Sequence, residues 1–497
     1  MAGLSTESGL TNVVITQPKA SEMSRSRPSG TRQRHRHFDI AIIGTGSGNT
    51  IIDDRYSDKR IAICERGVFG GTCINIGCIP TKMFAYAAEV AESVRDSARF
   101  GVDARVDGVR WNDIVSRVFG RIDPLVMSGE DYRRSSPNVE LFSSHTRFGP
   151  TTANGRHRLL TDDGDELTAD QVVIATGARA VVPDAIARSG LNYHTSDTIM
   201  RIAELPRHLV IVGGGFIAAE FAHIFSGLGS RVTLVIRGDT LLRKCDHTLC
   251  GRFTAIAGKN WDIRTHRNVI GCTQDRTGIT LRLDDGSRLH ADTLLVATGR
   301  IANSDMLNAE SAGIKIIDGL VSVDKYQRTT ARGIYALGDV SSPYQLKHVA
   351  NHEARVVKNN LLADWDDTDA LMSADHRYVP SAVFTDPQIA TVGLTENEAR
   401  AQGYNVRSKV QEYADVAYGW AMEDTTGFAK IVVDGDTGLI LGAHIMGHQA
   451  SLLIQPLIQA MRFGLTAQDV AHDQYWIHPA LSELIENALL ALCDDPH

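Results

Sequence analysis

The 497-residue sequence predicts an α/β fold in which two tandem Rossmann-like domains precede a smaller α+β domain. Three observations predict this architecture. A glycine-rich turn between apolar strands occurs twice, the two copies share their downstream sequence, and the pattern changes beyond Val379. The length agrees, because one domain usually takes about 100–200 residues and roughly three or four domains are expected here.

The first copy begins at Phe38 with the apolar segment FDIAIIG, which runs into Gly44, Gly46 and Gly48. We expect a helix after this turn, followed by a second apolar strand, IAIC, that ends at Glu65. A glycine turn alone is weak evidence, but an acid about 20 residues further on can accept hydrogen bonds from a ribose. The combination predicts a dinucleotide-binding domain.

The second copy begins at His208 with LVIVG, Gly213 and Gly215, and we expect its helix to run to Phe225. Its second strand, RVTLVI, ends at Arg237, and Arg243 follows six residues later. A planar guanidinium group can donate two hydrogen bonds to a phosphate, whereas NAD favours an acid at this position. We therefore predict NADPH as the second nucleotide, with ordinary surface charge as the alternative.

The duplication continues beyond the nucleotide-binding segments. Asp-Asp-Gly at residues 162–164 precedes VVIATGAR, and the same tripeptide at 284–286 precedes LLVATGR. Such turns join short alternating strands, so both copies are expected to contain a β-meander. The first copy is longer because it contains the segment GGTCINIGCIPTKMF and a helical run. We therefore expect the first domain to contain reactive residues that the second domain lacks.

The predicted domain organisation has five segments. Residues 1–37 are rich in Ser, Thr and Arg, and we expect a disordered extension there, with an organelle transit peptide as the alternative. The first Rossmann-like domain is expected over 38–190 and the second over 191–298. The chain then returns to the first domain over 299–375. The α+β domain occupies 376–497, where apolar strands give way to helices.

Composition excludes several classes of function. The formal net charge of −8 argues against a general nucleic-acid-binding protein. No apolar run reaches the roughly 20 residues of a membrane span, and we expect a cytoplasmic protein. Seven cysteines in so long a chain do not form the disulfide framework of a small secreted protein. We expect five of them to be structural thiols: Cys64, Cys245, Cys250, Cys272 and Cys493.

Cys73 and Cys78 are the remaining pair, in the segment GGTCINIGCIPTK. A disulfide needs Cα atoms about 4.4–6.8 Å apart, so residues five apart can be bridged only where the helix is interrupted. Gly77 permits such an interruption, and Pro80 suits the first turn of a helix. Cys78 would then lie at the positive end of the helix dipole, which favours a thiolate. Buried thiols and zinc ligands are the alternatives, although of other cysteines only Cys64 is near.

The segment from Cys73 to Lys82 resembles the redox-active motif of the flavoprotein, or pyridine nucleotide, disulfide reductases. The resemblance extends from Phe38 essentially to the C-terminus and includes both fingerprints, GIYALGD ending at Asp339, and WIHPALSELIE. It implies that the protein is an oxidoreductase with FAD as cofactor, NADPH as reductant and a low-molecular-weight disulfide as substrate. It also implies a homodimer, assembled through the C-terminal domain.

The resemblance also implies roles for individual residues. Cys78 is expected to be the thiolate that faces the flavin, and Cys73 the thiol that exchanges with substrate. His478 is implied to be the acid that protonates the leaving thiol, and Glu483 is implied to orient it. Both residues would complete the site of the partner subunit. Without the resemblance, a histidine before a proline would be interpreted as structural. Lys82 and Glu220 are implied to form an ion pair beside the flavin. No metal ligand is predicted. The predicted cofactor-binding residues are Gly44, Gly46, Gly48, Glu65, Thr72, Lys82, Gly177, Asp339, Gly213, Gly215, Arg237, Arg243 and Gly299.

Within this family, GTGSGN, FGRIDPLVMSGEDYRR, YGWAMEDTTG and IQPLIQAM most resemble the mycothione reductase branch, which acts on mycothiol disulfide in cellular thiol redox homeostasis. Glutathione-type reductases and dihydrolipoamide dehydrogenase are the alternatives, and a non-catalytic FAD-binding redox sensor is the alternative from another class. Two departures from the family are Asn49, where a third glycine is usual, and Phe216, where a tyrosine is frequent. Asp53 and Asp54 are expected to accept hydrogen bonds from sugar hydroxyls of the substrate. The alternative is that they simply face solvent.

Overall fold

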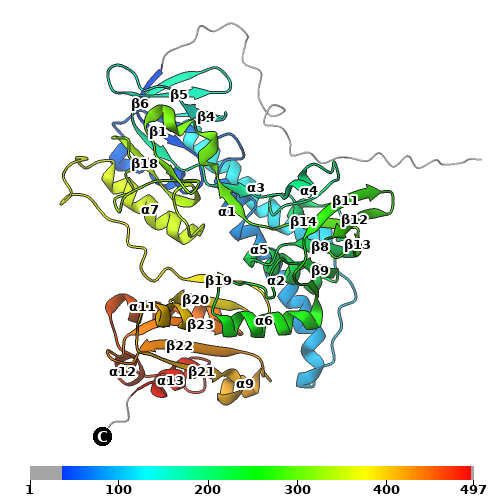
Figure 1. Ribbon diagram of the computed structural model, residues 1–497. Coiled ribbons are helices and arrows are strands. Elements are labelled where there is room, and N and C mark those ends of the chain that lie inside the picture. The colour runs from blue at the N-terminus through cyan, green and yellow to red at the C-terminus, as the bar shows by residue number, and fades with distance from the viewer. Residues whose placement is uncertain (1–35, 494–497) are drawn as a thin grey trace, which may run out of the picture.

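The computed structural model describes residues 36–493, and its first sheet surrounds the first glycine turn (Figure 1). The strand order is β3-β2-β1-β6-β5-β4, with β18 beside β6. The strands are β1 (Arg36–Ile43), β2 (Ile61–Cys64), β3 (Val139–Phe142), β4 (Thr146–Phe148), β5 (His157–Thr161), β6 (Glu166–Ile174) and β18 (Ile334–Ala336). β1 is parallel to β2 and to β6, and these strands end level with Ile43. Gly44 and Glu65 therefore follow at one edge of the sheet, where nucleotides bind in such folds.

The N-terminus of β1 differs from the sequence prediction by two residues. Residues 1–35 of the expected extension lie outside the described part of the chain. Arg36 and His37, which were also predicted to belong to the extension, are instead the first residues of β1. Arg36 aligns with Leu167 of β6, and its guanidinium group forms an ion pair with Glu140 of β3. These strand and charge contacts explain why β1 includes residues before Phe38.

The second sheet repeats the topology of the first, which confirms the predicted duplication. Its order is β10-β9-β8-β14. The strands are β8 (His208–Val212), β9 (Arg231–Val235), β10 (Asp262–Arg264) and β14 (Thr293–Val296). Gly44 and Gly213 occupy the same place after β1 and β8, with φ of 105° and 135°. A Cβ on either glycine would lie 2.2 Å from a carbonyl oxygen of the neighbouring strand's end, Ala175 or Ala297. Only glycine fits both turns.

The two Asp-Asp-Gly turns form hairpins as predicted. The turn at 162–164 joins the antiparallel strands β5 and β6. The turn at 284–286 joins β12 (Gly278–Leu283) to β13 (Arg288–Ala291). Together with β11 (Val269–Asp275), these strands form a separate sheet of order β11-β12-β13. In the first copy β6 continues from the hairpin into the parallel sheet, whereas the second copy divides this strand into β13 and β14.

The helix expected after the first glycine turn is absent from the structure. Residues 44–60 contain only two short 3-10 turns, η1 (Gly48–Thr50) and η2 (Asp54–Tyr56). Asp53 caps η2 by accepting a hydrogen bond from the backbone N–H of Arg55 at 3.0 Å. Asp, Asn, Ser and Thr favour turns and caps over helix interiors because their side chains hydrogen-bond to the nearby backbone, and this segment is rich in them. The prediction of a Rossmann-type helix here was wrong.

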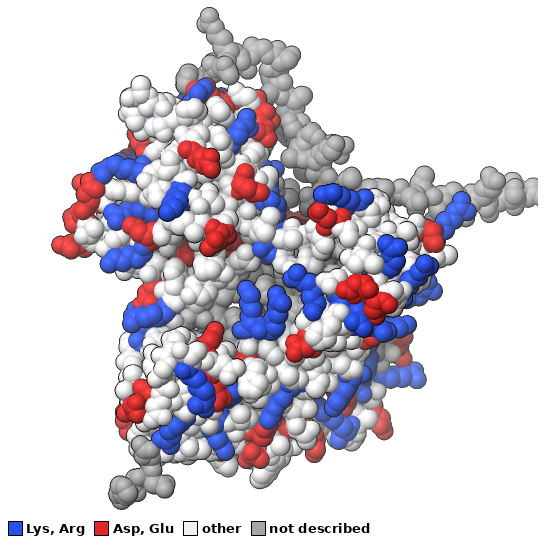
Figure 2. All heavy atoms as spheres, in the orientation of Figure 1, with Lys and Arg blue, Asp and Glu red and all other residues white. Residues whose placement is uncertain are grey.

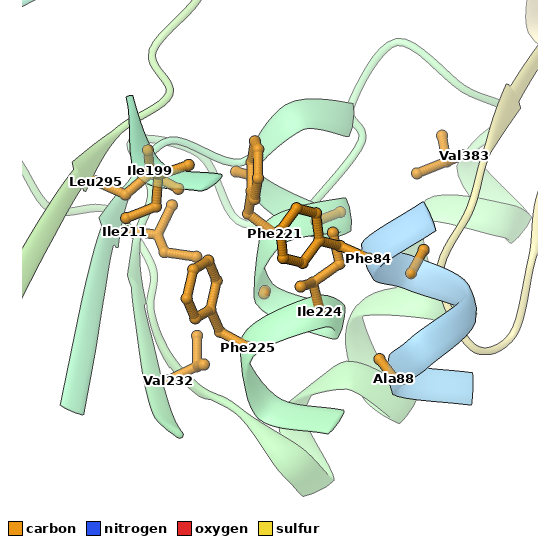
Figure 3. Close-up of a cluster of buried hydrophobic side chains, with 14 of the residues drawn as sticks. Phe84, Ala88, Ile199, Ile211, Phe221, Ile224, Phe225, Val232, Leu295 and Val383 are labelled. Atoms are coloured by element: carbon orange, nitrogen blue, oxygen red, sulfur yellow. The ribbon is translucent and has the colours of Figure 1, made fainter. Parts of the chain in front are cut away.

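The insertion in the first copy forms three helices: α1 (Gly71–Asn75), α2 (Cys78–Asp96) and α3 (Trp111–Ser135). α2 packs against α5 (Phe216–Gly227), the helix that follows the second glycine turn. Figure 3 shows Phe84 of α2 directed toward Phe221 of α5, with Phe225 one turn further along. The ring centroids of Phe84 and Trp111 lie 5.2 Å apart, and those of Trp111 and Phe225 lie 5.5 Å apart. This apolar contact joins the two nucleotide-binding units.

The chain returns to the first sheet after the second domain. β18 pairs with β6 in parallel. It is followed by η7 (Gly338–Val340) and α7 (Lys347–Asn360). β7 (Ala178–Ala180) and β15 (Arg300–Ala302) form an antiparallel pair beside this return. The loop ending in Asp339 is therefore brought back to the edge of the sheet at which Gly44 lies.

The C-terminal part is a separate α+β unit, as the sequence predicts (Figure 1). Its antiparallel sheet has the order β19-β20-β23-β22-β21. The strands are β19 (Ser381–Val383), β20 (Ile389–Gly393), β21 (Val406–Glu412), β22 (Phe428–Asp434) and β23 (Ile440–Met446). The helices are α8 (Glu396–Ala401), α9 (Ala417–Ala421), α10 (Ala450–Leu453), α11 (Gln455–Phe463), α12 (Ala467–His472) and α13 (Glu483–Leu490). Within residues 36–493 no helix is both long and apolar enough to cross a membrane.

We predict that Phe84→Ala lowers the free energy of unfolding by about 3–5 kcal/mol, because it opens a cavity between α2 and α5. Phe84 is fully buried, whereas Phe100 is 47% exposed and provides the matched control. Phe100→Ala should cost less than about 1 kcal/mol. Urea unfolding followed by circular dichroism measures both effects. Equal losses in the two variants would contradict the importance of this contact.

Candidate active site

A continuous cavity of about 3980 Å³ runs between the carboxyl edges of the two parallel sheets. Small-molecule pockets usually measure about 300–1,000 Å³, so this cavity has room for more than one large ligand. Both glycine turns line it, as does the N-terminal turn of α2. Figure 2 shows a hollow across the middle of one face with Lys and Arg side chains beside it, while acidic and basic groups alternate over the rest of that face.

The first end of the cavity has the shape and polarity of a dinucleotide site. Glu65, at the end of β2, accepts hydrogen bonds from the backbone N–H and the hydroxyl of Thr45 at 3.0 and 2.6 Å. The buried hydroxyl of Thr176 has no hydrogen-bond partner among the described residues. Burial raises the pKa of Asp339, whose carboxyl group also lines the cavity. These groups fit FAD, which offers ribose hydroxyls to carboxylates and a pyrophosphate to the glycine turn at Gly44.

Most residues predicted to bind FAD line this cavity, and Gly48 is the exception. The lining includes Gly44, Gly46, Glu65, Thr72, Lys82, Gly177 and Asp339. Gly48 is packed beneath the turn, where a Cβ would approach the Cβ of Ala175 to 2.8 Å. The absence of a side chain at Gly48 therefore allows the turn to pack closely on the sheet. The neighbouring Asn49 accepts a hydrogen bond from Arg133 of α3 at 2.8 Å, which accounts for its place in the fingerprint.

The two motif cysteines lie at a break between helices. Cys73 is within α1, and Cys78 is the first residue of α2. A Cβ on Gly77 would lie 2.9 Å from the carbonyl oxygen of Thr72 and 3.2 Å from the Cα of Cys73. Glycine thus allows the chain to fold closely enough for the two thiols to make contact, as the sequence predicts. Pro80 lies in the first turn of α2, also as predicted.

The cysteine pair is in the dithiol form, and its electrostatics favour a thiolate on Cys78. A hydrogen bond from Cys73 lowers the pKa of Cys78 to about 7, with a further contribution from Lys82 that opposes the effect of burial. Cys73 donates this hydrogen bond to Cys78, and the hydrogen bond together with burial raises the pKa of Cys73. As the pH rises through about 7, Cys78 is therefore the first of the two to lose its proton while Cys73 keeps its own, and Cys78 provides the nucleophilic or electron-rich sulfur.

Lys82 and Glu220 form an ion pair between α2 and α5. The distance from Nζ to Oε1 is 2.7 Å, and Glu220 also accepts a hydrogen bond from the backbone N–H of Phe384 at 3.0 Å. The ammonium group lies 4.2 Å from the centroid of the Phe384 ring. Lys82 is four residues, one helical turn, after Cys78. The structure therefore brings Cys73, Cys78, Lys82 and Glu220 together at one wall of the cavity.

Two buried groups beneath this ion pair escaped sequence analysis. His223, one turn after Glu220 on α5, is 1% exposed, and its Nδ1 lies 3.4 Å from Glu92 Oε2. Burial, followed by the charge of Lys82, lowers the pKa of His223 to about 4. Burial raises the pKa of Glu92 to about 8. No motif marked either residue, because only the packing of α5 on α2 brings them together.

The second end of the cavity contains the residues predicted to bind the other nucleotide. Gly213, Gly215, Arg237, Arg243 and Gly299 all line it. Gly215 is the N-cap of α5, a position at which backbone N–H groups can bind a phosphate. Lys244 also lines this end but was not identified from the sequence. In the described part of the chain, Arg237, Arg243 and Lys244 form no ion pair with a carboxylate.

His478 and Glu483 contact each other but lie apart from the cysteines of their own chain. The distance from His478 Nδ1 to Glu483 Oε1 is 2.6 Å, and Glu483 Oε2 accepts a hydrogen bond from the backbone N–H of Ala480 at 3.2 Å. The side chain of His478 is 73% exposed. Neither residue is among those that line the cavity, within residues 36–493. The carboxylate therefore orients a histidine whose ring is available to another molecule.

Asp53 and Asp54 do not lie where a substrate wall was expected. Asp53 forms ion pairs with Arg55 at 3.0 Å and with Lys358 at 2.8 Å. The hydrogen bond from Arg55, followed by that from Lys358 against the effect of burial, lowers the pKa of Asp53. Neither acid is among the residues that line the cavity. Asp53 therefore has charged partners of its own, and the helix on which the sugar-binding prediction relied is replaced by the cap of η2. That these acids accept hydrogen bonds from sugar hydroxyls stays a prediction.

Lys347 and Ser47 are further cavity residues that motif analysis missed. Lys347 is the first residue of α7, and its Nζ lies 2.7 Å from the hydroxyl of Ser47 in the first glycine turn. Ser47 also donates a hydrogen bond to Asn351 of α7 at 3.2 Å. These contacts join the glycine turn to the returning helix. Their separation by about 300 residues explains why no local pattern indicated them.

Comparison with known proteins places this geometry in a family. Residues 38–354 match the family model described as pyridine nucleotide-disulphide oxidoreductase, and residues 379–489 match its dimerisation domain. The chain is 67% identical over 455 residues to mycothione reductase from Mycobacterium tuberculosis, covering 92% of this chain and 99% of the relative. It is 32% identical over 452 residues to glutathione reductase from Burkholderia cepacia, covering 90% and 97%. The HOCl-induced flavoprotein disulfide reductase RclA from Escherichia coli has a similar structure, with a TM-score of 0.79 and 28% identity over 91% of this chain and 99% of that chain.

In the reduced protein we predict that Cys78 is alkylated as a group of pKa about 7, with a rate that rises as pH increases through this value. Cys73→Ala should raise this pKa more than Lys82→Met does, because the hydrogen bond from Cys73 is the larger cause. Iodoacetamide labelling across a pH series, followed by peptide mass spectrometry, measures the rates. Cys64, with its pKa raised by burial to about 12, is the internal control and should stay unlabelled. A pKa near 9 for Cys78 in the unaltered protein would contradict the site geometry.

Proposed function

The chain belongs to the pyridine nucleotide-disulphide oxidoreductase family, and from this membership we propose that it is an FAD-dependent, NADPH-driven reductase of mycothione, the disulfide of mycothiol. The observation that carries the proposal is the position of the Cys73–Cys78 pair, with an ion pair behind it, on the wall shared by both nucleotide ends of the cavity. The similarity to mycothione reductase supports the choice of substrate. Its role would be the maintenance of cellular thiol redox balance.

In this proposal, different residues bind FAD at the first end of the cavity and NADPH at the second. When bound at the first end, FAD supplies the transfer of two electrons from NADPH to the Cys73–Cys78 disulfide. Glu65 and Asp339 would hold its hydroxyl groups, and the glycine turn its pyrophosphate. Arg237 and Arg243 would hold the 2′-phosphate of NADPH at the second end. Lys82 presents a positive charge beside the redox centre, and Glu220 fixes its position.

Reduction of the substrate then follows from the properties of the two sulfurs. Cys73, after losing its proton, attacks one sulfur of mycothione; a mixed disulfide forms, and one mycothiol leaves as its thiolate and takes up a proton. The Cys78 thiolate next attacks Cys73, which restores the protein disulfide and releases the second mycothiol. A histidine is needed to move these protons. We propose that His478, oriented by Glu483, performs this task.

We propose that the active unit is a homodimer in which His478 acts at the cysteines of the partner subunit. Three observations support this arrangement: the match to a dimerisation domain, the separation of His478 from the cavity of its own chain, and the exposure of apolar side chains near it. Tyr475 and Ile477 are fully and 74% exposed in the single chain. Burying such groups is a large part of the stabilisation of obligate dimers.

Two further assignments accompany this proposal. We propose a cytoplasmic location, in keeping with a substrate that is an intracellular thiol reserve. We also propose the domain division given by the sequence: FAD-binding segments over 38–190 and 299–375, an NADPH-binding domain over 191–298, and a dimerisation domain over 376–497. The two sheet topologies support this division, with β1 in fact beginning at Arg36.

The purified protein should reduce mycothione with a kcat/KM at least about 100-fold above that for glutathione disulfide, because a site for neutral sugars leaves the charged groups of glutathione unpaired. NADPH oxidation in the presence of mycothione, glutathione disulfide or lipoamide measures the preference. Anaerobic titration of the protein with a reductant distinguishes a reductase from a redox sensor without a catalytic disulfide. A reductase takes up twice as many electrons as flavin alone, because the disulfide is reduced as well. Efficient turnover of glutathione disulfide would contradict the substrate assignment.

Mixing a Cys73→Ser protein with a His478→Ala protein should restore activity that neither has alone, because a heterodimer contains one intact composite site. Subunits are exchanged by mild denaturation, and differently tagged heterodimers are isolated before assay. Mixing the unaltered protein with either variant is the positive control for exchange. Isolated heterodimers without activity would show instead that each site is built within one chain.

A further inference from the structure

Lys430 is a fully buried lysine whose ammonium group crosses the boundary between the second nucleotide domain and the C-terminal domain. It lies on β22, and its side chain is 2% exposed. Nζ is 3.0 Å from both carboxylate oxygens of Asp246, 2.9 Å from Glu396 Oε2 and 3.2 Å from the hydroxyl of Thr248. Burying an ammonium group is costly unless it is paired and hydrogen-bonded, and here every donor has an acceptor.

Asp246, the main partner of Lys430, begins a helix of the nucleotide domain. It is the N-cap of α6 (His247–Asn260) and accepts a hydrogen bond from the backbone N–H of Thr248 at 3.0 Å. Its side chain is 1% exposed. Burial by itself would raise the pKa of Asp246, but the hydrogen bonds and charge of Lys430, with that of His444, lower it. The carboxylate is therefore ionised and held by a residue of another domain.

The residues just before Asp246 form the arginine loop, residues 240–246, which borders the second end of the cavity. The backbone N–H of Leu242 donates to the carbonyl of Gly214, in the second glycine turn, at 2.8 Å. Beyond Leu242, the backbone N–H of Cys245 donates to the carbonyl of Leu242 at 2.8 Å, and Asp246 follows directly. Arg243 and Lys244 lie within this short turn and line the cavity. The turn that carries both cations is therefore closed inside the nucleotide domain and ends next to a residue, Asp246, that is held by the C-terminal domain.

We propose that Lys430 is a positioning residue for NADPH, and that it fixes the arginine loop through Asp246 so that Arg243 and Lys244 meet the 2′-phosphate. This inference rests on the proposed function, because it assumes that NADPH binds at this end of the cavity. It assigns part of the nucleotide specificity to the C-terminal domain, to which β22 belongs.

Other contacts hold the two domains together, so the buried charge of Lys430 is not needed for that purpose. A second ion pair joins α6 to the C-terminal sheet: Arg252 contacts Glu412 at 2.7 Å, with both side chains more than a third exposed. The guanidinium group also stacks over Phe428 at 4.6 Å, and Phe428 belongs to the same apolar cluster as Phe253 of α6. Apolar packing commonly replaces a buried ion pair without loss of stability. The contact of Lys430 with the cap of α6 therefore points to a role in orientation.

The test compares Lys430→Met and Asp246→Asn with Glu412→Gln, which weakens the other ion pair of the same helix. Binding of adenosine 2′,5′-bisphosphate and of AMP to the FAD-containing dimer is measured by calorimetry. Lys430→Met and Asp246→Asn should each weaken binding of the bisphosphate by about fivefold or more, a partial loss of charge-assisted hydrogen bonds. AMP affinity should change by less than about twofold, because AMP lacks the group that the loop contacts.

Steady-state kinetics should agree with the binding data. The KM for NADPH should rise in both variants while kcat and the KM for the disulfide stay near those of the unaltered enzyme. Glu412→Gln should leave the affinities for both nucleotides unchanged. Equal weakening of the bisphosphate and AMP, or the same effect in Glu412→Gln, would overturn the proposal, because either result would indicate a general disturbance of the domain.

Arg243→Ala separates failure of this inference from failure of the proposed function. If Arg243→Ala weakens only the bisphosphate and Lys430→Met does not, Lys430 has no positioning role and NADPH remains the nucleotide. If Arg243→Ala leaves the preference for the bisphosphate unchanged, the NADPH assignment fails and this inference fails with it. Should Lys430→Met not fold, Asp246→Asn decides, since asparagine still caps a helix. Unaltered bisphosphate affinity in that variant would overturn the proposal.

Discussion

The packing of α2 against α5 is the contact on which the rest of the structure depends. One helix begins at Cys78 and the other begins at the second glycine turn, so their contact brings a redox pair and a nucleotide turn to the same cavity. Phe84 and Phe221 fill the interface, while Lys82 and Glu220 meet at its cavity end. The apolar part supplies most of the stabilisation, because a partly exposed ion pair alone contributes little. The ion pair then defines which turn of each helix reaches the cavity.

Much of this arrangement was predictable because it depends on local patterns. The turns at Gly44 and Gly213 are recognisable since each admits no side chain beside a neighbouring carbonyl oxygen, and this constraint places a glycine at the same point of both copies. The interruption between α1 and α2 was equally accessible, since Gly77 and Pro80 determine it within a few residues. Repetition strengthened these predictions, because the tails of the two copies have to fold alike. All the residues predicted to bind cofactors line the cavity except Gly48.

The failures concern contacts between distant segments. Residues 44–60 resemble the start of a Rossmann helix, but Asp53 is used as a cap and as a partner of Lys358, about 300 residues away. Gly48 was taken for a ligand contact although it serves packing on Ala175. Lys347 and His223 were missed, because their importance appears only when α7 meets the first turn and when α5 meets α2. A single sequence contains no signal for such pairs beyond the identity of the residues.

The pair formed by His223 and Glu92 has an electrical consequence for the redox centre. Between pH about 4 and about 8 the histidine is deprotonated and the glutamic acid is protonated, so neither carries a charge. The interior behind Lys82 and Glu220 therefore behaves as an insulating layer. Because neither group is charged in this range, His223 and Glu92 do not offset the field of that ion pair. A change in the charge of the redox sulfurs would consequently act on Lys82 without a competing charge from this pair.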